Sequence, residues 1–191
     1  MDEYYSPLWR RLDTAGHDAC RILPHKDGWR LSGHAVFRHE DGRPASLAYS
    51  VDCDGDWVSL AGRVQGFIDR TPVDVTITRR DGQWIQGEKV WGLADCQDLD
   101  FGFTPATNIL QLKRENMPVG EHRLVPATWF DLDCPMIRLP QTYERLSETR
   151  YHYTSPQGGY DEVLEIREDG WVIHYPRLWR AEPMMSARNA A

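Results

Sequence analysis

The sequence predicts a mostly β protein: a single large antiparallel sheet, strongly curved into an incomplete, half-open barrel, with little helix. Three observations predict it. Stretches with alternating or β-branched residues follow one another along most of the 191 residues, and Asp-Gly pairs separate many of them. No capped pattern of helical period runs longer than about three turns, the usual helix length. So many strands leave open edges, which proteins remove by closing a sheet, nearly closing it or stacking two sheets.

Asp-Gly pairs mark the expected hairpins, because this pair suits the positive φ angles of a type I′ turn. The five pairs, each between β-rich stretches, are Asp27-Gly28, Asp41-Gly42, Asp54-Gly55, Asp81-Gly82 and Asp169-Gly170. The last is the clearest, since residues alternate on both of its sides, over 163–167 and 171–175. We therefore predict a two-strand ribbon here that ends at Pro176.

The same patterns predict further strands at 29–37, 46–51, 57–64, 73–78 and 123–130. Residues 97–103 are predicted as a strand, followed by a corner at 104–108 and another strand that ends in Lys113 and Arg114. The best helical candidate is 141–148, where Thr142 and Tyr143 suit a strand equally well. We expect one β-rich domain over residues 1–183 and a disordered tail over 184–191.

Composition excludes several classes of function. A formal charge of −7, with 22 Lys and Arg against 29 Asp and Glu, argues against binding a nucleic-acid backbone. We find no export signal and no run of about 18 apolar residues, so we predict a cytoplasmic protein without a transmembrane segment. The four cysteines lie far apart and the histidines lack metal-binding spacings, so we predict reduced thiols, no metal site and no cofactor.

Asp98 and Asp100 allow two interpretations. On a strand both carboxylates would project from one face, with Cα atoms about 7 Å apart, a separation that could suit the acid and base of glycoside hydrolysis. Alternatively, the acids are structural, lie on a wet face and are balanced by Lys113, Arg114 or another cation. Leu99, Phe101 and Phe103 would then point inward from the opposite face. We assign no catalytic residue.

The corner Thr104-Pro105-Ala106-Thr107-Asn108 also has two interpretations. Its hydroxyls and amide could recognise a ligand at an apolar rim, or they could bond to their own backbone in a plain turn. The eight Trp and eight Tyr exceed the needs of an ordinary core of this size, and amphipathic aromatics commonly line ligand sites. Four tyrosines could form a ligand wall or the outward half of ordinary strands: Tyr143, Tyr151, Tyr153 and Tyr175.

Several motifs in order resemble a known family. They are Trp9-Arg10, Tyr49 to Asp54 with Trp57, Asp98-Leu99-Asp100 with the corner and Leu110, Gln141-x-Tyr143, and Asp169-Gly170 to Trp179. Together they resemble the bacterial domain-of-unknown-function family labelled putative glycolipid-binding. The resemblance implies a fold similar to the lipoprotein-localisation carriers (LolA-like), with a glycolipid or another lipid as ligand. The sequence has Gln111 and Lys113 where family members commonly have Pro and Arg, and Arg114 keeps the family residue.

We therefore expect a non-enzymatic module that holds an apolar ligand in the concave face of the half-barrel. The expected rim residues are Asp98, Asp100, Thr104, Thr107, Asn108 and Arg114, and the expected wall residues are Phe101, Phe103, Trp171 and Tyr175. Two alternatives remain open: a hydrolase of carbohydrate or lipid-linked substrates that uses Asp98 and Asp100, and a protein-interaction domain. The sequence does not predict the oligomeric state.

Overall fold

The described part of the chain forms two sheets and one α-helix. The computed structural model describes residues 5–183, so the tail predicted over 184–191 lies outside the described residues. The large sheet has 14 strands in the order β10-β13-β14-β15-β16-β17-β1-β2-β3-β4-β5-β6-β7-β8. Its strands are β1 Leu8–Arg11, β2 Gly16–His25, β3 Gly28–Arg38, β4 Pro44–Cys53, β5 Ser59–Ile68, β6 Thr71–Arg80, β7 Gln83–Gln86, β8 Lys89–Gly92, β10 His122–Leu124, β13 Thr142–Ser147, β14 Arg150–Ser155, β15 Tyr160–Ile166, β16 Val172–Tyr175 and β17 Trp179–Ala181. All its pairings are antiparallel.

The predicted hairpins are confirmed, because every Asp-Gly pair lies where two consecutive, paired strands of this sheet are joined, with Gly28 as the first residue of β3. At the turn between β6 and β7, Asp81 and Gly82 have φ angles of 50° and 76°, as a type I′ turn requires. The turn between β2 and β3 differs, since there Lys26 takes the positive φ of 53°. Local turn chemistry thus fixes the meander in the N-terminal half of the sheet.

The expectation of a single sheet is wrong. Strands β9 Asp98–Phe101, β11 Ala127–Asp131 and β12 Cys134–Leu139 form a separate three-stranded sheet, in which β9 runs parallel to β11. The strand predicted over 123–130 is accordingly two strands, one in each sheet. Pro126 lies between them, and a proline cannot donate to a ladder of backbone hydrogen bonds.

The helix lies elsewhere than predicted. Helix α1, Asn108–Glu115, occupies the segment predicted as a second strand, whereas the helical candidate 141–148 is strand β13. Ile109, Leu110 and Leu112 are buried, at spacings that also fit one face of a helix. The helix ends at Asn116, whose φ of 40° is left-handed, and two cations in its last turn complement the helix dipole.

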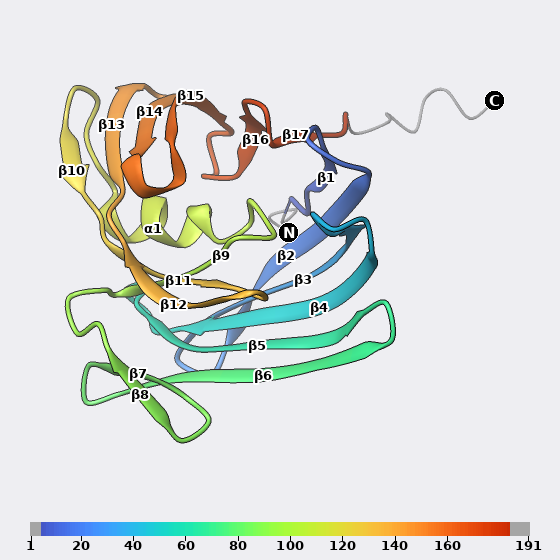
Figure 1. The fold of residues 1–191 in the computed structure, drawn as a ribbon. Helices are drawn as coiled ribbons and strands as arrows, with labels where there is room; N and C mark the ends of the chain where they lie inside the picture. Colours follow the sequence, from blue (N-terminus) through green and yellow to red (C-terminus); the bar gives the residue numbers. More distant parts are fainter. Residues whose placement is uncertain (1–4, 184–191) are drawn as a thin grey trace.

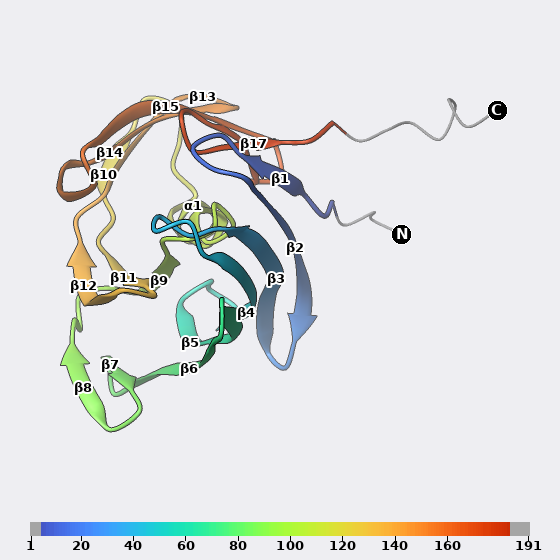
Figure 2. The same ribbon diagram turned by 45° about the vertical axis from the view of Figure 1, so that its right-hand side comes forward.

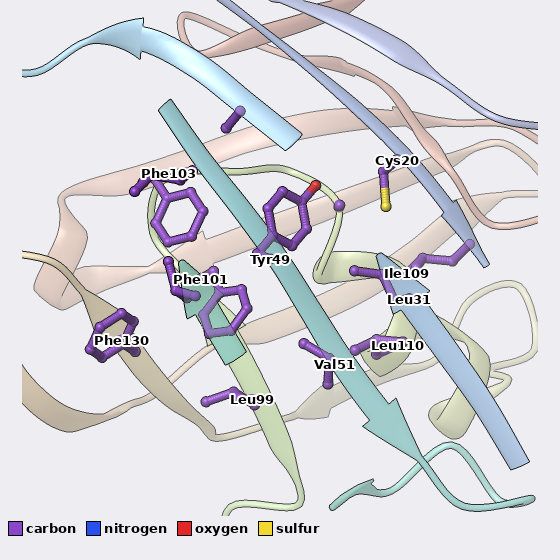
Figure 3. Close-up of a cluster of buried hydrophobic side chains, with 14 of the residues drawn as sticks. Cys20, Leu31, Tyr49, Val51, Leu99, Phe101, Phe103, Ile109, Leu110 and Phe130 are labelled. Atoms are coloured by element: carbon purple, nitrogen blue, oxygen red, sulfur yellow. The ribbon is translucent and has the colours of Figure 1, made fainter. Parts of the chain in front are cut away.

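Helix α1 lies between two parts of the large sheet in both views, β13–β15 on one side and β3–β5 on the other (Figures 1 and 2). The small sheet lies beside it. The space between these elements is filled by buried side chains of the protein itself (Figure 3); they include Leu31, Tyr49, Val51, Leu99, Phe101, Phe103, Ile109 and Leu110. A second buried cluster, which includes Tyr143, Tyr151, Tyr153, Tyr160 and Leu164, packs on β13–β15. One cavity that remains lies beside the small sheet.

Candidate functional site

A cavity of about 240 Å³ lies where the small sheet meets strands β14–β17 of the large sheet. Segments from four regions of the chain build it: β9 and the corner after it, β11 with β12, the end of β14 with the 3₁₀ turn Pro156–Gly158, and β15–β17. The lining residues are Asp100, Phe101, Gly102, Thr104, Asn108, Trp129, Ile137, Leu139, Tyr153, Ser155, Gln157, Gly158, Tyr160, Tyr175, Leu178 and Trp179.

Three tyrosines form one wall of the cavity. The rings of Tyr160 and Tyr175 meet edge to face with centroids 4.8 Å apart, and Tyr153 packs against both at 5.6 Å and 5.8 Å. Such pairs add to the stability gained from burial, so the wall is held in place by its own contacts. The Tyr160 hydroxyl also donates a hydrogen bond to the Pro176 carbonyl, which fixes the β16–β17 turn against the wall.

Asp100 is the acid of the cavity, and it is only 7% exposed. Its Oδ1 accepts a hydrogen bond from Thr107 Oγ1 at 2.6 Å, and its Oδ2 accepts one from Gln141 Nε2 at 2.7 Å. Burial raises the pKa of this carboxyl, and the two donors offset the effect only in part. No cation of the described chain forms an ion pair with it within 4.0 Å, so its charge is unbalanced when ionised.

Ser155 places a free hydroxyl in the same cavity. The residue is 3% exposed, and no described atom lies in hydrogen-bonding geometry with its Oγ. The Ser155 hydroxyl lies near that of Tyr153 and lowers the pKa of Tyr153, whereas burial, the largest effect, raises it. A buried hydroxyl without a partner is costly in a folded protein and commonly marks a place where a ligand or water completes the bonding.

Asp98 lies outside the cavity and is fully buried. Arg114 donates from Nη2 to Oδ2 at 2.6 Å and from Nε to Oδ1 at 3.1 Å. Burial raises the pKa of Asp98, but the two-pronged contact with a guanidinium that is always charged favours the ionised carboxylate. The predicted pairing with Arg114 is confirmed, and the expectation that both acids lie on a wet face is wrong.

The corner bonds mainly to distant side chains. Thr104 donates to Asp18, Thr107 donates to Asp100, and Asn108 Nδ2 donates to the Tyr143 hydroxyl at 2.8 Å. Local bonds exist as well, since the backbone N–H of Ala106 donates to Thr104 Oγ1. The plain-turn interpretation therefore describes a small part of the bonding. Thr104 and Asn108 line the cavity, although their described polar contacts point into the protein.

The structure brings together part of the predicted site. Asp100, Phe101, Thr104, Asn108 and Tyr175 line the cavity, whereas Asp98, Phe103, Thr107, Arg114 and Trp171 do not. Phe103 stacks on Phe101 in the core with centroids 5.4 Å apart, and Trp171 packs on Trp9 at 5.6 Å. Sequence reasoning missed the lining residues Gly102, Trp129, Ile137, Leu139, Ser155, Gln157, Gly158, Tyr160, Leu178 and Trp179. The Gln-Gly-Gly turn before Tyr160 is the local signal that could have pointed to this part of the lining.

Other kinds of site were sought in the described residues. All four cysteines are free thiols, as predicted, and only Cys134 is exposed. Residues 5–183 contain no group of three or more His, Cys, Asp or Glu side chains that could hold a metal ion. No helix of this described part is long and apolar enough to cross a membrane.

Fold and cavity together define a class of protein: a mostly β chain with one large antiparallel sheet, a small second sheet, one helix, and a small cavity lined by aromatic rings. The chain belongs to the family described as Putative glycolipid-binding, whose profile matches residues 7–181. Among solved structures it is similar to a DUF1089 family protein from Pseudomonas aeruginosa, determined at 1.80 Å resolution, with a TM-score of 0.74 and 22% identity over 85% of this chain and 91% of that one. No curated protein matches.

Proposed function

We propose that this protein binds a glycolipid or another lipid without chemical turnover, that the cavity is its binding site, and that the large sheet serves as a half-open barrel around that site. The observation that carries the proposal is a cavity in which a tyrosine wall faces a buried acid and a free hydroxyl. A few placed polar groups in an aromatic lining are typical of small-molecule sites. The family description supports the same class of ligand.

The size of the cavity limits what enters it. Its volume of about 240 Å³ lies below the roughly 300–1,000 Å³ of most ligand pockets. The space facing α1 is taken by buried side chains such as Phe101 and Phe103, so a long acyl chain has no room beside them. We propose that a ring-sized headgroup or a short part of a chain enters the cavity and that the rest of the lipid stays outside.

The hydrolase alternative has less support. A two-carboxylate mechanism needs both acids at the substrate, with one of them free to donate a proton. Asp100 lines the cavity, but Asp98 does not, and Arg114 contacts both of its oxygens. The cavity therefore offers one carboxyl group instead of two. The cytoplasmic location and the protein-interaction alternative stay predictions.

A cavity-filling variant tests the proposal. Gly158 lines the cavity without a positive φ, and a Cβ there would lie 3.6 Å from Ser155 Oγ, so Gly158→Phe adds a large side chain beside that hydroxyl. Gly55→Phe is the matched control, since Gly55 is exposed, lies outside the cavity, and would place its Cβ no closer than 3.4 Å to another residue.

Freshly purified protein would be analysed by native mass spectrometry followed by lipid extraction, and its melting temperature would be measured with a lipid panel. We expect a bound lipid, or a higher melting temperature with one lipid class, in the wild type and in Gly55→Phe but not in Gly158→Phe. If no lipid is recovered and none raises the melting temperature, or if Gly158→Phe binds as well as the wild type, the proposal is wrong. Recovery of a stoichiometric protein partner instead would favour the interaction alternative.

A further inference from the structure

We infer that the cavity selects an uncharged, hydroxyl-rich ring, such as the sugar of a neutral glycolipid, and rejects anionic headgroups. This inference rests on the proposed function, because it names the chemical class that the same cavity takes. It depends on three features of the lining: its charge, its free polar groups and its aromatic faces.

The described lining carries one acidic side chain and no cation. Asp100 is the one charged side chain among the described residues that line the cavity, and no described Arg, Lys or His joins it there. Sites that bind phosphate or carboxylate groups commonly use Arg or Lys. An anionic headgroup would instead meet the buried carboxylate of Asp100, whose neighbours Thr107 and Gln141 are neutral. Repulsion between like charges is strong where water is largely excluded.

The cations near the cavity are already paired. Arg177 lies over the Tyr160 ring at 5.1 Å, behind the wall, and its Nε lies 3.1 Å from Glu162 Oε1. Arg114, in the last turn of the helix that follows the corner, contacts Asp98 and lies 2.7 Å from Glu115 as well. Neither guanidinium lines the cavity.

The polar groups of the cavity suit hydroxyls. A carboxylate oxygen can accept two hydrogen bonds, and each oxygen of Asp100 accepts one from a described side chain. Asp100 can therefore accept further bonds from ligand hydroxyls. Ser155 Oγ, without a described partner, can donate one bond and accept others. A ligand with several hydroxyls can donate to Asp100 and bond to Ser155 at the same time.

The aromatic faces suit a ring with apolar C–H groups. Trp129, Tyr153, Tyr160 and Tyr175 present rigid, amphipathic surfaces to the cavity. A sugar ring combines apolar C–H faces with hydroxyls at its edge, so it can bury the former against the rings while the latter bond to Asp100 and Ser155. A simple alkyl chain would leave Ser155 Oγ without a partner and would bring no donor to Asp100.

Matched ligands test the selection. Octyl β-glucoside, octyl phosphate and nonanoate carry the same eight-carbon alkyl chain and differ in headgroup. Each would be titrated into the wild type at pH 8, below its micelle concentration, by calorimetry. We expect octyl glucoside to bind at least about tenfold more tightly than either anion. Methyl β-glucoside should displace it, which shows that the sugar itself is recognised whether it comes free or on a lipid.

Ser155→Ala sharpens the test, because removing a hydroxyl that has no described partner should leave the fold intact. We expect this variant to weaken octyl glucoside binding about five- to tenfold, the usual effect of losing one hydrogen bond to a ligand, and to leave the anions unchanged. The inference is overturned if an anion binds as tightly as the glucoside, if methyl glucoside fails to displace it, or if Ser155→Ala changes nothing. The proposed function itself fails if none of the three compounds binds to the wild type. It also fails if Gly158→Phe binds each compound as tightly as the wild type does.

Discussion

Arg114 holds Asp98 in a two-pronged ion pair that joins the last turn of α1 to strand β9. The Asp98 side chain is fully buried, and that of Arg114 is 15% exposed. Burial opposes the charge of Arg114, but the Asp98 carboxylate outweighs this effect and raises the pKa of Arg114. Removing one partner would leave a buried charge unbalanced. We expect Arg114→Ala to lower the free energy of unfolding by about 3–5 kcal/mol, measured by urea denaturation.

An exposed pair provides the control for this prediction. Arg63 and Asp74 lie 3.3 Å apart with side chains 52% and 62% exposed, so Arg63→Ala should change stability by less than about 0.5 kcal/mol. In the double variant Asp98→Asn with Arg114→Met, no buried charge is left, and the loss should be smaller than the sum of the single losses. If Arg114→Ala and Arg63→Ala lower the free energy of unfolding equally, the buried pair is no more important for stability than the exposed pair.

Asp18 makes the stability depend on pH. It is buried beneath the corner, where Tyr49 and Thr104 donate to its Oδ2, and burial raises its pKa from 3.8 to about 6. The folded state therefore holds a proton that the unfolded chain releases between about pH 4 and 6. Stability from this group is fully present below pH 4 and falls by about 3 kcal/mol as the pH rises through 6.

Asp18→Asn isolates that contribution, because it replaces the titrating carboxyl group with an amide and changes no other titratable residue. The free energy of unfolding of both proteins would be measured by urea denaturation from pH 4 to pH 7.5. As the pH rises, the wild type should lose about 3 kcal/mol of stability relative to the variant. A difference that stays constant across this range would show that Asp18 titrates normally.

Gly66 should be the more sensitive of two glycines with positive φ. Its φ is +147°, and a Cβ there would lie 1.9 Å from the Ser46 carbonyl oxygen on the paired strand β4. Gly42, with a φ of +85°, would meet nothing within 4 Å. We expect Gly42→Ala to cost about 1 kcal/mol from backbone strain alone and Gly66→Ala to cost several times more. Thermal unfolding of both variants compares them, and similar melting temperatures would contradict the register of β4 and β5.

The thiols should react in two classes. Burial raises the pKa of Cys53 to about 12 and that of Cys96 to about 11, and it raises the pKa of Cys20 as well, whereas Cys134 is exposed. A thiol reacts as its thiolate, so a disulfide reagent should modify Cys134 quickly and the other three only after unfolding. Cys134→Ser should abolish the fast phase. More than one fast thiol in the native wild type would contradict the described burial.

Turn chemistry made much of the large sheet predictable. Asp81 and Gly82 take their positive φ angles for reasons that lie within two residues, so the hairpin could be recognised locally. Helix α1 could not, because Ile109, Leu110 and Leu112 suit a buried strand as well as one face of an eight-residue helix. The decision falls to tertiary packing between the small sheet and β13–β15.

The site was harder to predict because its parts are far apart in the chain. The parallel pairing of β9 with β11 places Asp100 opposite Trp129. A crossover between parallel strands leaves no local turn signal. The role of Asp98 likewise depended on the helix, which returns Arg114 to the strand. The sequence motif therefore located the right segment. That one acid lines the cavity and the other pairs with Arg114 could be seen only from the fold.

A crystal structure of the protein with octyl β-glucoside tests the central claim most directly, namely that this cavity is the binding site. We expect the sugar ring in the cavity, packed against the tyrosine wall of Tyr153, Tyr160 and Tyr175, with hydroxyls bonded to Asp100 and Ser155 and the alkyl chain leading out past Gly158. An empty cavity at a saturating concentration of the glucoside, or a ligand bound only elsewhere on the protein, would contradict the claim.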